Sequence, residues 1–250
     1  MKRHLLWALG LVLLSCAPPE SSSPPRNVLV LGLDVSGSFR AAHYKDAVDF
    51  AAYYIYGHLH GLGGLRKPTA VFVGSVGGEA PGEVKSFHPI ADFEDKSVDQ
   101  IREDLDTWFP PTDRLTDYNA FFSRIATLVK RQNLVLAPLN IVVLTDGVPD
   151  VPVAHTGRQD SLKVYARVNM DALEYLSRNV TVRLLYPTPT VAVGWERGVK
   201  RDRVRLWTLD AQVMNGWHAQ ISPDQPPETQ ARLWRWVDDN VDFRVRSSIL

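Results

Sequence analysis

The chain has 250 residues, 45% of them hydrophobic and 22% charged, which is typical of a folded globular protein and excludes a disordered or collagen-like chain. Its 28 Lys and Arg residues balance 28 Asp and Glu residues, so the formal net charge is zero. Without a basic excess or a long basic run, we expect no nucleic-acid partner. The length favours one folded domain over two.

Residues 1–15 have the pattern of a lipoprotein signal peptide. Lys2 and Arg3 form a basic start, and residues 5–14 form an apolar stretch that is too short for a stable transmembrane helix. The stretch runs into Leu-Leu-Ser-Cys at residues 13–16, which resembles a bacterial lipobox. The resemblance implies that Cys16 becomes the lipidated first residue of the mature protein. An ordinary signal peptide with a chance cysteine is the alternative.

Residues 16–26 are predicted to link the lipid to the folded domain. The stretch APPESSSPPR at residues 17–26 is rich in Pro and Ser and cannot bury enough apolar surface to fold, so it is expected to be a tether. Ala17, rather than Asp, follows the predicted lipidated cysteine. By resemblance, this implies the outer membrane if the cell is Gram-negative. We therefore expect an exported protein, anchored to the bacterial cell envelope, with one domain over residues 27–250.

Beyond the tether, apolar segments alternate with amphipathic ones. Near-continuous apolar strands separated by helices indicate a parallel sheet that is covered on both faces. We therefore predict an α/β fold, a doubly wound, mostly parallel, Rossmann-like central sheet with helices on both faces. The predicted strands are residues 28–33, 69–76, 139–144, 181–186 and 204–209, and the predicted helices are residues 41–60, 97–109, 116–132, 161–178 and 227–240.

Two of the predicted strands end in an acidic residue. Asp34 follows residues 28–33 in the segment DVSGS, and Asp146 follows residues 139–144 in the segment LTDG. Ligands of doubly wound sheets bind beyond the carboxyl ends of the strands. We therefore expect both acids to reach the same edge of the sheet.

These motifs resemble those of the von Willebrand factor type A domain family. Residues 34–38, DVSGS, are similar to its D-x-S-x-S element, and residues 145–147, TDG, are similar to its later T-D-G element. Thr116 matches the third element, because it opens a predicted helix and has the small Ala120 four positions on. Thr112, among prolines, is a weaker candidate. The resemblance extends over about residues 27–243.

The resemblance implies a metal-ion-dependent adhesion site that binds one Mg²⁺ or Mn²⁺. Ser36, Ser38 and Thr116 would bind the cation through their hydroxyl oxygens. Asp34 and Asp146 would act mostly through hydrogen bonds to the serines or to coordinated water. Both cations prefer octahedral oxygen ligands. With neutral ligands the cation could accept an Asp or Glu of a protein partner, and we expect a binding protein rather than an enzyme.

Residues beside the motifs are candidates for partner recognition, although such loops vary freely in this fold. Gly37 is expected to let the first loop turn tightly enough for both serines to face the cation. The candidates are Phe39 and Arg40 after the first motif, Asp117 and Tyr118 after Thr116, and residues 148–150 after Asp146.

Each motif also has a simpler explanation. Ser36, Ser38 or Thr116 could cap a helix, and Asp146 could mark a turn. Ser36 lies at a strand-to-helix turn, as a hydrolase nucleophile would, but lacks the G-x-S-x-G surround. Asp34, an acid after a first strand, could be a phosphoryl-transfer nucleophile. A metal-independent scaffold subunit of an envelope complex and a metal-dependent hydrolase or phosphatase therefore stay open beside the adhesion domain.

Two further groups of residues invite a functional interpretation. His58 and His60 lie on different faces of a predicted helix without Cys or acidic neighbours, so we expect them at a helix end rather than on zinc. Core packing is the better explanation for most of the late tryptophans. These are Trp195, Trp207, Trp217, Trp234 and Trp236.

Overall fold

The structure, a computed structural model, describes residues 27–243 except for 81, 84, 151–160 and 178. The predicted signal peptide, Cys16 and the tether lie outside the described residues. In the described part of the chain, no helix is long and apolar enough to cross a membrane.

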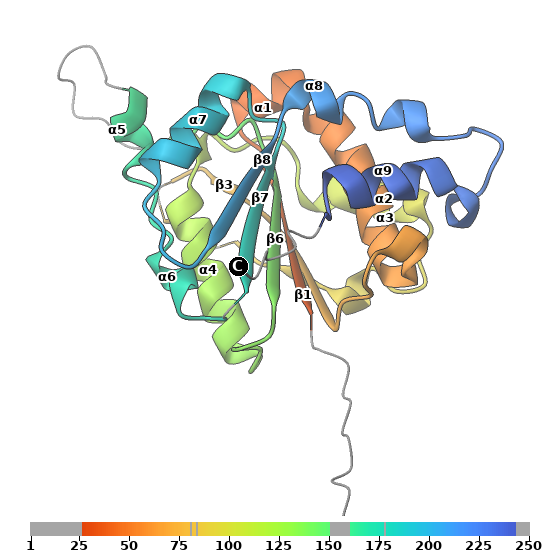
Figure 1. The fold of residues 1–250 in the computed structure, drawn as a ribbon, viewed down its shortest axis with the longest axis horizontal. Coiled ribbons are helices and arrows are strands. Elements are labelled where there is room, and N and C mark those ends of the chain that lie inside the picture. The colour runs from red at the N-terminus through yellow and green to blue at the C-terminus, as the bar shows by residue number, and fades with distance from the viewer. Residues whose placement is uncertain (1–26, 81, 84, 151–160, 178, 244–250) are drawn as a thin grey trace, which may run out of the picture.

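A six-stranded sheet with the order β4-β2-β1-β6-β7-β8 forms the centre of the molecule (Figure 1). All neighbours pair in parallel except β4, which is antiparallel to β2 at one edge. The sheet grows from β1 to β2 on one side and continues from β6 on the other, so the order reverses between β1 and β6. The strands are β1 Val28–Leu33, β2 Ala70–Ser75, β4 His88–Pro89, β6 Leu139–Leu144, β7 Val180–Leu185 and β8 Arg205–Leu209; β3 Gly77–Gly78 and β5 Leu115–Thr116 form a separate ladder.

Helices cover both faces of this sheet, so the predicted doubly wound α/β fold is confirmed (Figure 1). Helices α2, α3 and α9 lie over one face, and α4, α6 and α7 lie over the other. Their bounds are α1 Gly37–Ala42, α2 Tyr44–His60, α3 Val98–Trp108, α4 Tyr118–Arg131, α5 Ser161–Tyr165, α6 Asp171–Glu174, α7 Pro189–Gly198, α8 Ala211–Met214 and α9 Ala231–Asn240. Single 3₁₀ turns lie at Leu62–Gly64, Ile90–Asp92, His218–Gln220 and Pro227–Thr229.

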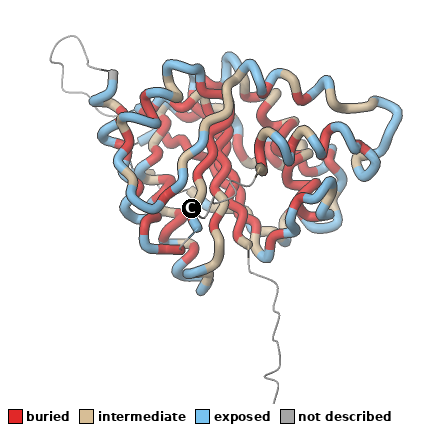
Figure 2. The backbone as a smooth tube through the Cα atoms, in the orientation of Figure 1, coloured by how far each residue is buried: buried red, intermediate tan, exposed pale blue. Residues whose placement is uncertain are grey.

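The side chains of β1 alternate between two cores, which explains its unbroken apolar sequence. Leu29, Leu31 and Leu33 pack against α2, α3 and α9, while Val28 and Val30 pack against α4 and its neighbours. All five are at most 1% exposed, and the whole sheet centre is buried (Figure 2). A strand buried on both faces has no polar side to alternate with its apolar one.

Two predicted helices are each divided into two. The helix predicted over residues 41–60 breaks at His43, where φ is −137°. The helix predicted over 161–178 becomes α5 and α6, because Asn169 accepts the backbone N–H of Asp171 and its own N–H goes to Asn119. Such side-chain bonds compete with helix formation. The sequence analysis missed α7, although Thr188 caps it and Pro189 opens it.

His58 and His60 lie in the last turn of α2, at a helix end as expected, but the His58 side chain is buried, at 1% exposed. Its Nδ1 lies 3.0 Å from the carbonyl oxygen of Arg66.

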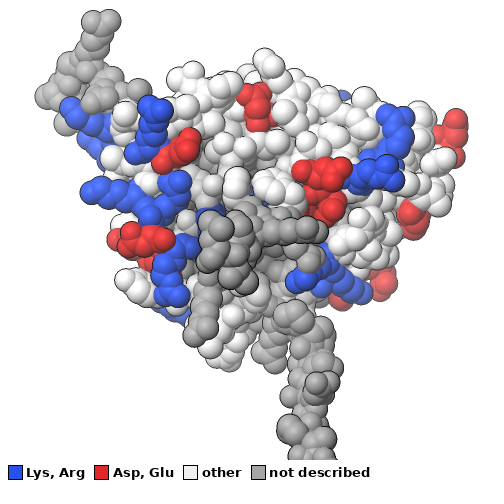
Figure 3. Space-filling view, in the orientation of Figure 1, with Lys and Arg blue, Asp and Glu red and all other residues white. Residues whose placement is uncertain are grey.

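Three of the late tryptophans are buried as expected, while Trp236 is half-buried and Trp207 is 36% exposed on β8. Basic and acidic side chains both occur across the face shown in Figure 3.

Candidate metal centre at the end of β1 and β6

Asp34 leaves the sheet at the point where the strand order reverses. Its backbone N–H still donates to the carbonyl of Leu144 in β6, at 3.0 Å, and its side chain is fully buried. Carboxylate Oδ1 accepts the N–H of Ser36 at 2.9 Å, and Oδ2 accepts the hydroxyl of Thr145 at 2.6 Å. The two predicted motifs therefore meet, through their acid and their threonine.

Thr145 joins three elements of the fold. Its Oγ1 accepts the N–H of Gly147 at 3.0 Å and lies 2.6 Å from the hydroxyl of Tyr118, at the start of α4. All three side chains of the Asp34–Thr145–Tyr118 chain are at most 2% exposed. Buried polar groups linked in this way hold each other in one arrangement. Thr145 belongs to the predicted T-D-G motif, but its sequence position alone predicted no role for it.

Burial raises the pKa of Asp34 to about 6, against 3.8 for an exposed Asp. Its hydrogen bonds from Thr145 and Ser36 act in the opposite direction, and the neighbouring charge of Asp146 adds to the rise. Removal from water disfavours the charged carboxylate. A nearby positive charge would favour the ionised form, so this site is chemically suited to a cation.

Ser36 presents a hydroxyl that makes no hydrogen bond of normal geometry to a described residue, although it lies close enough to the Asp34 carboxylate to lower the pKa of that group. The residue is 2% exposed, and its Oγ is buried without a partner among the described residues. Ser36 is the N-cap residue of α1, but its side chain makes no capping hydrogen bond. Buried hydroxyls are normally satisfied, so an orphaned one indicates a missing ligand or water. This agrees with the ligand role implied for Ser36 and not with the capping alternative.

Ser38 lies in the first turn of α1, where its side chain is exposed. The expectation for Gly37 was wrong, because a Cβ at this position would meet nothing within 4 Å and its φ is not positive. An alanine could therefore form this turn as well. The loop is tight because it leads directly into a helix, not because it contains glycine.

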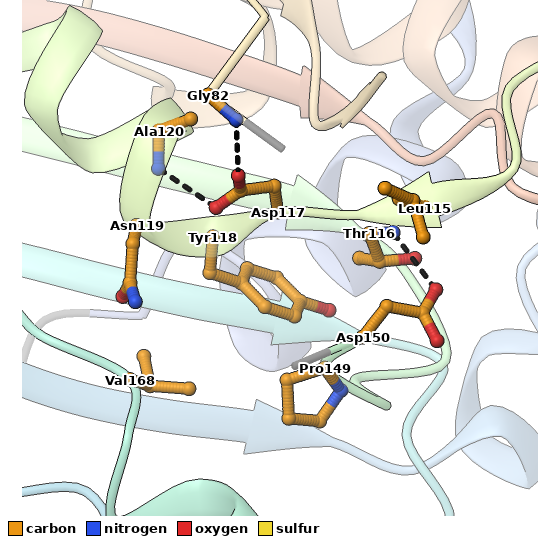
Figure 4. Close-up of a pocket in the computed structure, with 10 residues that line it drawn as sticks. All are labelled: Gly82, Leu115, Thr116, Asp117, Tyr118, Asn119, Ala120, Pro149, Asp150 and Val168. Atoms are coloured by element: carbon orange, nitrogen blue, oxygen red, sulfur yellow. Dashed lines mark hydrogen bonds between the residues drawn. The ribbon is translucent and has the colours of Figure 1, made fainter. Parts of the chain in front are cut away.

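Thr116 does not open a helix. It is buried in β5, and α4 is capped instead by Asp117, whose Oδ1 accepts the N–H of Ala120 at 2.9 Å. The backbone of Thr116 is paired with Asp150: its N–H donates to Oδ2 at 2.9 Å, and its carbonyl accepts the Asp150 N–H at 3.2 Å (Figure 4). The Thr116 hydroxyl makes no hydrogen bond to a described residue, so it remains available as a ligand.

Asp146 and Gly147 form a turn and also hold a carboxylate at this edge. Asp146 Oδ1 accepts the N–H of Val148 at 3.0 Å, and Gly147 adopts φ +79°, which favours glycine. The carbonyl of Gly147 accepts the indole N–H of Trp195 in α7 at 2.6 Å. A half-buried Asp146 thus lies close enough to raise the pKa of Asp34 by its charge.

Three candidates for partner recognition, Phe39, Tyr118 and Pro149, are buried. Phe39 is fully buried and packs edge-on against Tyr186, with ring centroids 5.7 Å apart. Tyr118 is 2% exposed and is bonded to Thr145, so it could contact a partner only from inside the pocket that it lines. Arg40 is exposed, and its guanidinium donates to the carbonyl of Pro111 at 3.1 Å. Asp117 is half-buried, as its carboxylate accepts N–H groups of Ala120 and Gly82.

A pocket of about 560 Å³ opens beside Thr116 (Figure 4). Tyr118 and Thr116 form one side of it, and Pro149 and Asp150 line it from the loop after β6. Its other lining residues are Gly82, Leu115, Asp117, Asn119, Ala120 and Val168. A mostly apolar hollow beside a candidate cation site is suited to the side chain next to a partner's acidic residue.

An ammonium group also lies at this end of the sheet. Lys85 Nζ is 2.5 Å from both carboxylate oxygens of Asp113, which is 5% exposed. The backbone of Asp113 pairs with that of Ser36, so the ion pair lies next to the first motif. Ser75, at the end of β2, has a second buried Oγ without a partner. The loop containing Lys85 has no sequence pattern that could have predicted this contact.

The donor set suits a cation that accepts neutral oxygen ligands. No group of three or more His, Cys, Asp and Glu side chains in the described part of the chain could hold a metal ion. A site here would therefore depend on the hydroxyls of Ser36, Ser38 and Thr116, with Asp34 and Asp146 as the nearby negative charges. This composition fits Mg²⁺ or Mn²⁺ better than zinc, which prefers His and Cys.

No protein-family model matches the chain, and no curated protein matches it. Among solved structures, the open conformation of the pilus adhesin SpaC from Lactobacillus rhamnosus GG matches 78% of this chain and 29% of its own, with 12% identity and a TM-score of 0.47. Proximal thread matrix protein 1 from the mussel byssus matches 84% of this chain and 46% of its own, with 12% identity and a TM-score of 0.42. The SpRpn10 VWA domain matches 82% of this chain and 93% of its own, with 11% identity and a TM-score of 0.40. This chain thus spans less than a third of the adhesin, and similarities at this level carry no argument about its function.

Proposed function

We propose that this protein is an adhesion module of the von Willebrand factor A type, which binds one Mg²⁺ or Mn²⁺ and recognises a protein partner through an acidic side chain of that partner. The observation that carries the proposal is the buried, unpartnered hydroxyl of Ser36 beside the buried carboxylate of Asp34. Both lie where the strand order reverses, the usual ligand position in doubly wound sheets.

Each motif residue has a defined part in this proposal. Ser36, Ser38 and Thr116 would hold the cation through their hydroxyls, and Asp34 and Asp146 would orient its water ligands. A bound cation would supply a positively charged position for the partner's carboxylate. Asp34 is already fixed by the N–H of Ser36 and the hydroxyl of Thr145, so its own geometry needs no rearrangement on binding.

The proposal includes export and lipid anchoring through Cys16 to the bacterial cell envelope, at the outer membrane if the cell is Gram-negative. It rests on the lipobox-like residues 13–16 and the Pro/Ser-rich stretch that follows. Mass spectrometry of the protein from its native membrane tests it. A lipid-modified Cys16 at the N-terminus is expected, and an unmodified cysteine would contradict this part alone.

Calorimetric titration of Mg²⁺, then Mn²⁺, into the full chain tests the site. One saturable binding event is expected, lost in Ser36→Ala and kept in Ser75→Ala. The two serines are a matched pair, since both are buried at the strand-end edge with unpartnered hydroxyls. Neither substitution removes a side-chain hydrogen bond, so the metal-free variants are expected to fold. Equal affinity in wild type and Ser36→Ala would refute the site.

The Lys85–Asp113 ion pair favours a second candidate, a metal-independent scaffold. Its ammonium group already supplies a positive charge next to the first motif. In that case Mg²⁺ would not bind the wild-type chain, and partner binding would persist with a chelator present and be weakened in Lys85→Gln. If Mg²⁺ binds only to Lys85→Gln, the ammonium group competes with the cation.

A further inference from the structure

The opposite edge of the sheet, where the strands begin, carries a second polar cavity of about 320 Å³. It lies on the face of the sheet that α2 and α9 cover elsewhere, and it includes positions before or at the start of β1, β6, β7 and β8. The lining residues are Asn27, Arg66, Pro138, Asn140, Asn179, Thr181, Arg183, Arg205, Trp207 and Asp242. The candidate metal centre lies at the other end of the strands, about 20 Å away for six residues.

Arg183 is a buried cation without a counter-ion among the described residues. It is 7% exposed and occupies an inward position of β7. Its guanidinium donates to Asn140 Oδ1 at 2.9 Å and to the carbonyl of Phe243 at 3.0 Å, which are both neutral acceptors. Its Nε has no partner, and no carboxylate of the described residues lies within ion-pair distance of this guanidinium. A buried charge is costly unless it is paired.

Two more guanidinium groups lie at the mouth of the cavity. Arg66 and Arg205 are exposed, and neither side chain makes a hydrogen bond or ion pair to a described residue. Asp242 is the acidic lining residue, and its Oδ1 is engaged by the Tyr54 hydroxyl at 3.4 Å and lies 4.0 Å from His58 Nε2. The cavity therefore has three positive groups against one negative group.

We infer that this cavity binds a phosphate group. A phosphate carries up to two negative charges and several acceptor oxygens, which match the excess of two positive charges and the fork geometry of arginine. The Asn side chains and Thr181 supply further donors. Trp207, 36% exposed and packed against Phe243 with centroids 5.4 Å apart, offers a flat apolar wall for the organic part of a phosphate ester.

The phosphate could belong to a free phosphate ester or to a lipid headgroup. The second source rests on the proposed lipid anchor, because Asn27, which lines the cavity, directly follows the predicted tether of residues 17–26. Ten residues span at most about 35 Å, so an anchored domain would hold this edge close to the bilayer.

The test uses the full-length chain with Cys16→Ser, in wild-type and variant forms, titrated with inorganic phosphate in a calorimeter. One saturable event is expected, weakened by about tenfold or more in Arg66→Gln/Arg205→Gln. Lys67→Gln/Arg203→Gln is the matched control, because it removes two neighbouring exposed cations that do not line the cavity. No saturable binding, or an equal loss in both double variants, would overturn the inference.

Sedimentation with vesicles separates the two sources. Phosphatidylcholine vesicles with added phosphatidylglycerol are compared with vesicles of phosphatidylcholine alone. Residues 1–26 are the same in all the chains compared, so any lipid affinity of this segment cancels. If Arg66→Gln/Arg205→Gln sediments less than the control double variant, the ligand is a lipid headgroup. If Arg66→Gln/Arg205→Gln weakens phosphate binding in the calorimeter but sediments with vesicles as the control double variant does, the ligand is a free phosphate ester. Failure of Mg²⁺ binding would leave both readouts unchanged, since the two sites lie at opposite edges.

Discussion

Thr145 donates its hydroxyl hydrogen to the carboxylate of Asp34 at 2.6 Å, across 111 residues of sequence. This bond joins the end of β1 to the end of β6, and the Tyr118 hydroxyl extends it to α4. Two motifs that are far apart in the chain are therefore one buried polar unit.

Asp34→Asn is expected to stabilise the metal-free protein at about pH 8 by roughly 1–3 kcal/mol and to abolish Mg²⁺ binding. The pKa of Asp34 is about 6 in the folded state and 3.8 for an exposed Asp, so burial opposes its charge. The side-chain oxygen of the introduced amide could still accept the N–H of Ser36. The Thr145 hydroxyl could turn so that its oxygen accepts the N–H of that amide. Denaturant unfolding measures the change, with Asp146→Asn as control. A destabilised Asp34→Asn chain would contradict the interpretation.

The same pKa fixes the direction of the pH dependence. Between pH 3.8 and about pH 6, Asp34 binds more protons in the folded state than in the unfolded state. The contribution of Asp34 to the free energy of unfolding therefore falls as the pH rises through this range and is constant above it. This slope is expected to be absent in Asp34→Asn.

Tyr118→Phe is expected to lower the free energy of unfolding by about 1–2 kcal/mol, because it removes a buried hydrogen bond to Thr145. A double-mutant cycle with Thr145→Val should give a clear coupling energy. The control cycle pairs Thr145→Val with Tyr44→Phe, whose hydroxyl bonds the carbonyl of Phe109 elsewhere. Additive effects in both cycles would mean that the buried unit has no cooperative stability.

Gly147→Ala is expected to destabilise the fold by about 2 kcal/mol or more. The residue has φ +79°, and a Cβ would lie 2.8 Å from Val191 Cγ1. Gly37→Ala is the matched control in the other motif, where a Cβ meets nothing within 4 Å. Thermal unfolding of both variants measures the difference. A comparable loss in Gly37→Ala would show that the first loop needs glycine after all.

Burial lowers the pKa of His58 below 6.5, with the charge of Arg183 acting in the same direction and Asp242 and the carbonyl of Arg66 acting against it. The unfolded chain then binds the proton more tightly, so this histidine's contribution to stability is present above pH 6.5 and is lost as the pH falls below it. His58→Gln should flatten this fall, as measured by urea unfolding between about pH 8 and 5.5. His60→Gln, an exposed change on the same helix, should leave it intact.

The strands were predictable where burial on both faces leaves a nearly continuous apolar run. β1 and β6 begin and end at the predicted residues, although β6 contains one polar residue, Asn140. β7 stops one residue early, at Leu185, because Tyr186 adopts φ +83° and directs its hydroxyl to Asp46 Oδ2 at 2.6 Å. That conformation depends on a contact 140 residues away, which no local pattern contains.

The same distinction applies to the candidate site. Asp34 and Asp146 could be assigned to one edge because parallel strands share their carboxyl ends. The bonds of Thr145 to Tyr118 and of Lys85 to Asp113 could not be predicted from the sequence, since each joins a loop or helix start to a distant segment. Phe39 and Tyr118 were expected in loops beside the motifs, whereas they lie in α1 and α4 and their rings are buried in the core.

The central position of β1 has a mechanical consequence. The strand is hydrogen-bonded along its length to β2 on one side and to β6 on the other. Tension between an attachment at Asn27 and a partner held near Asp34 would pull along the strand. Both ladders would then be loaded in shear, so their hydrogen bonds would share the force rather than break one at a time. An adhesion module under tension would gain resistance to unfolding from this arrangement alone.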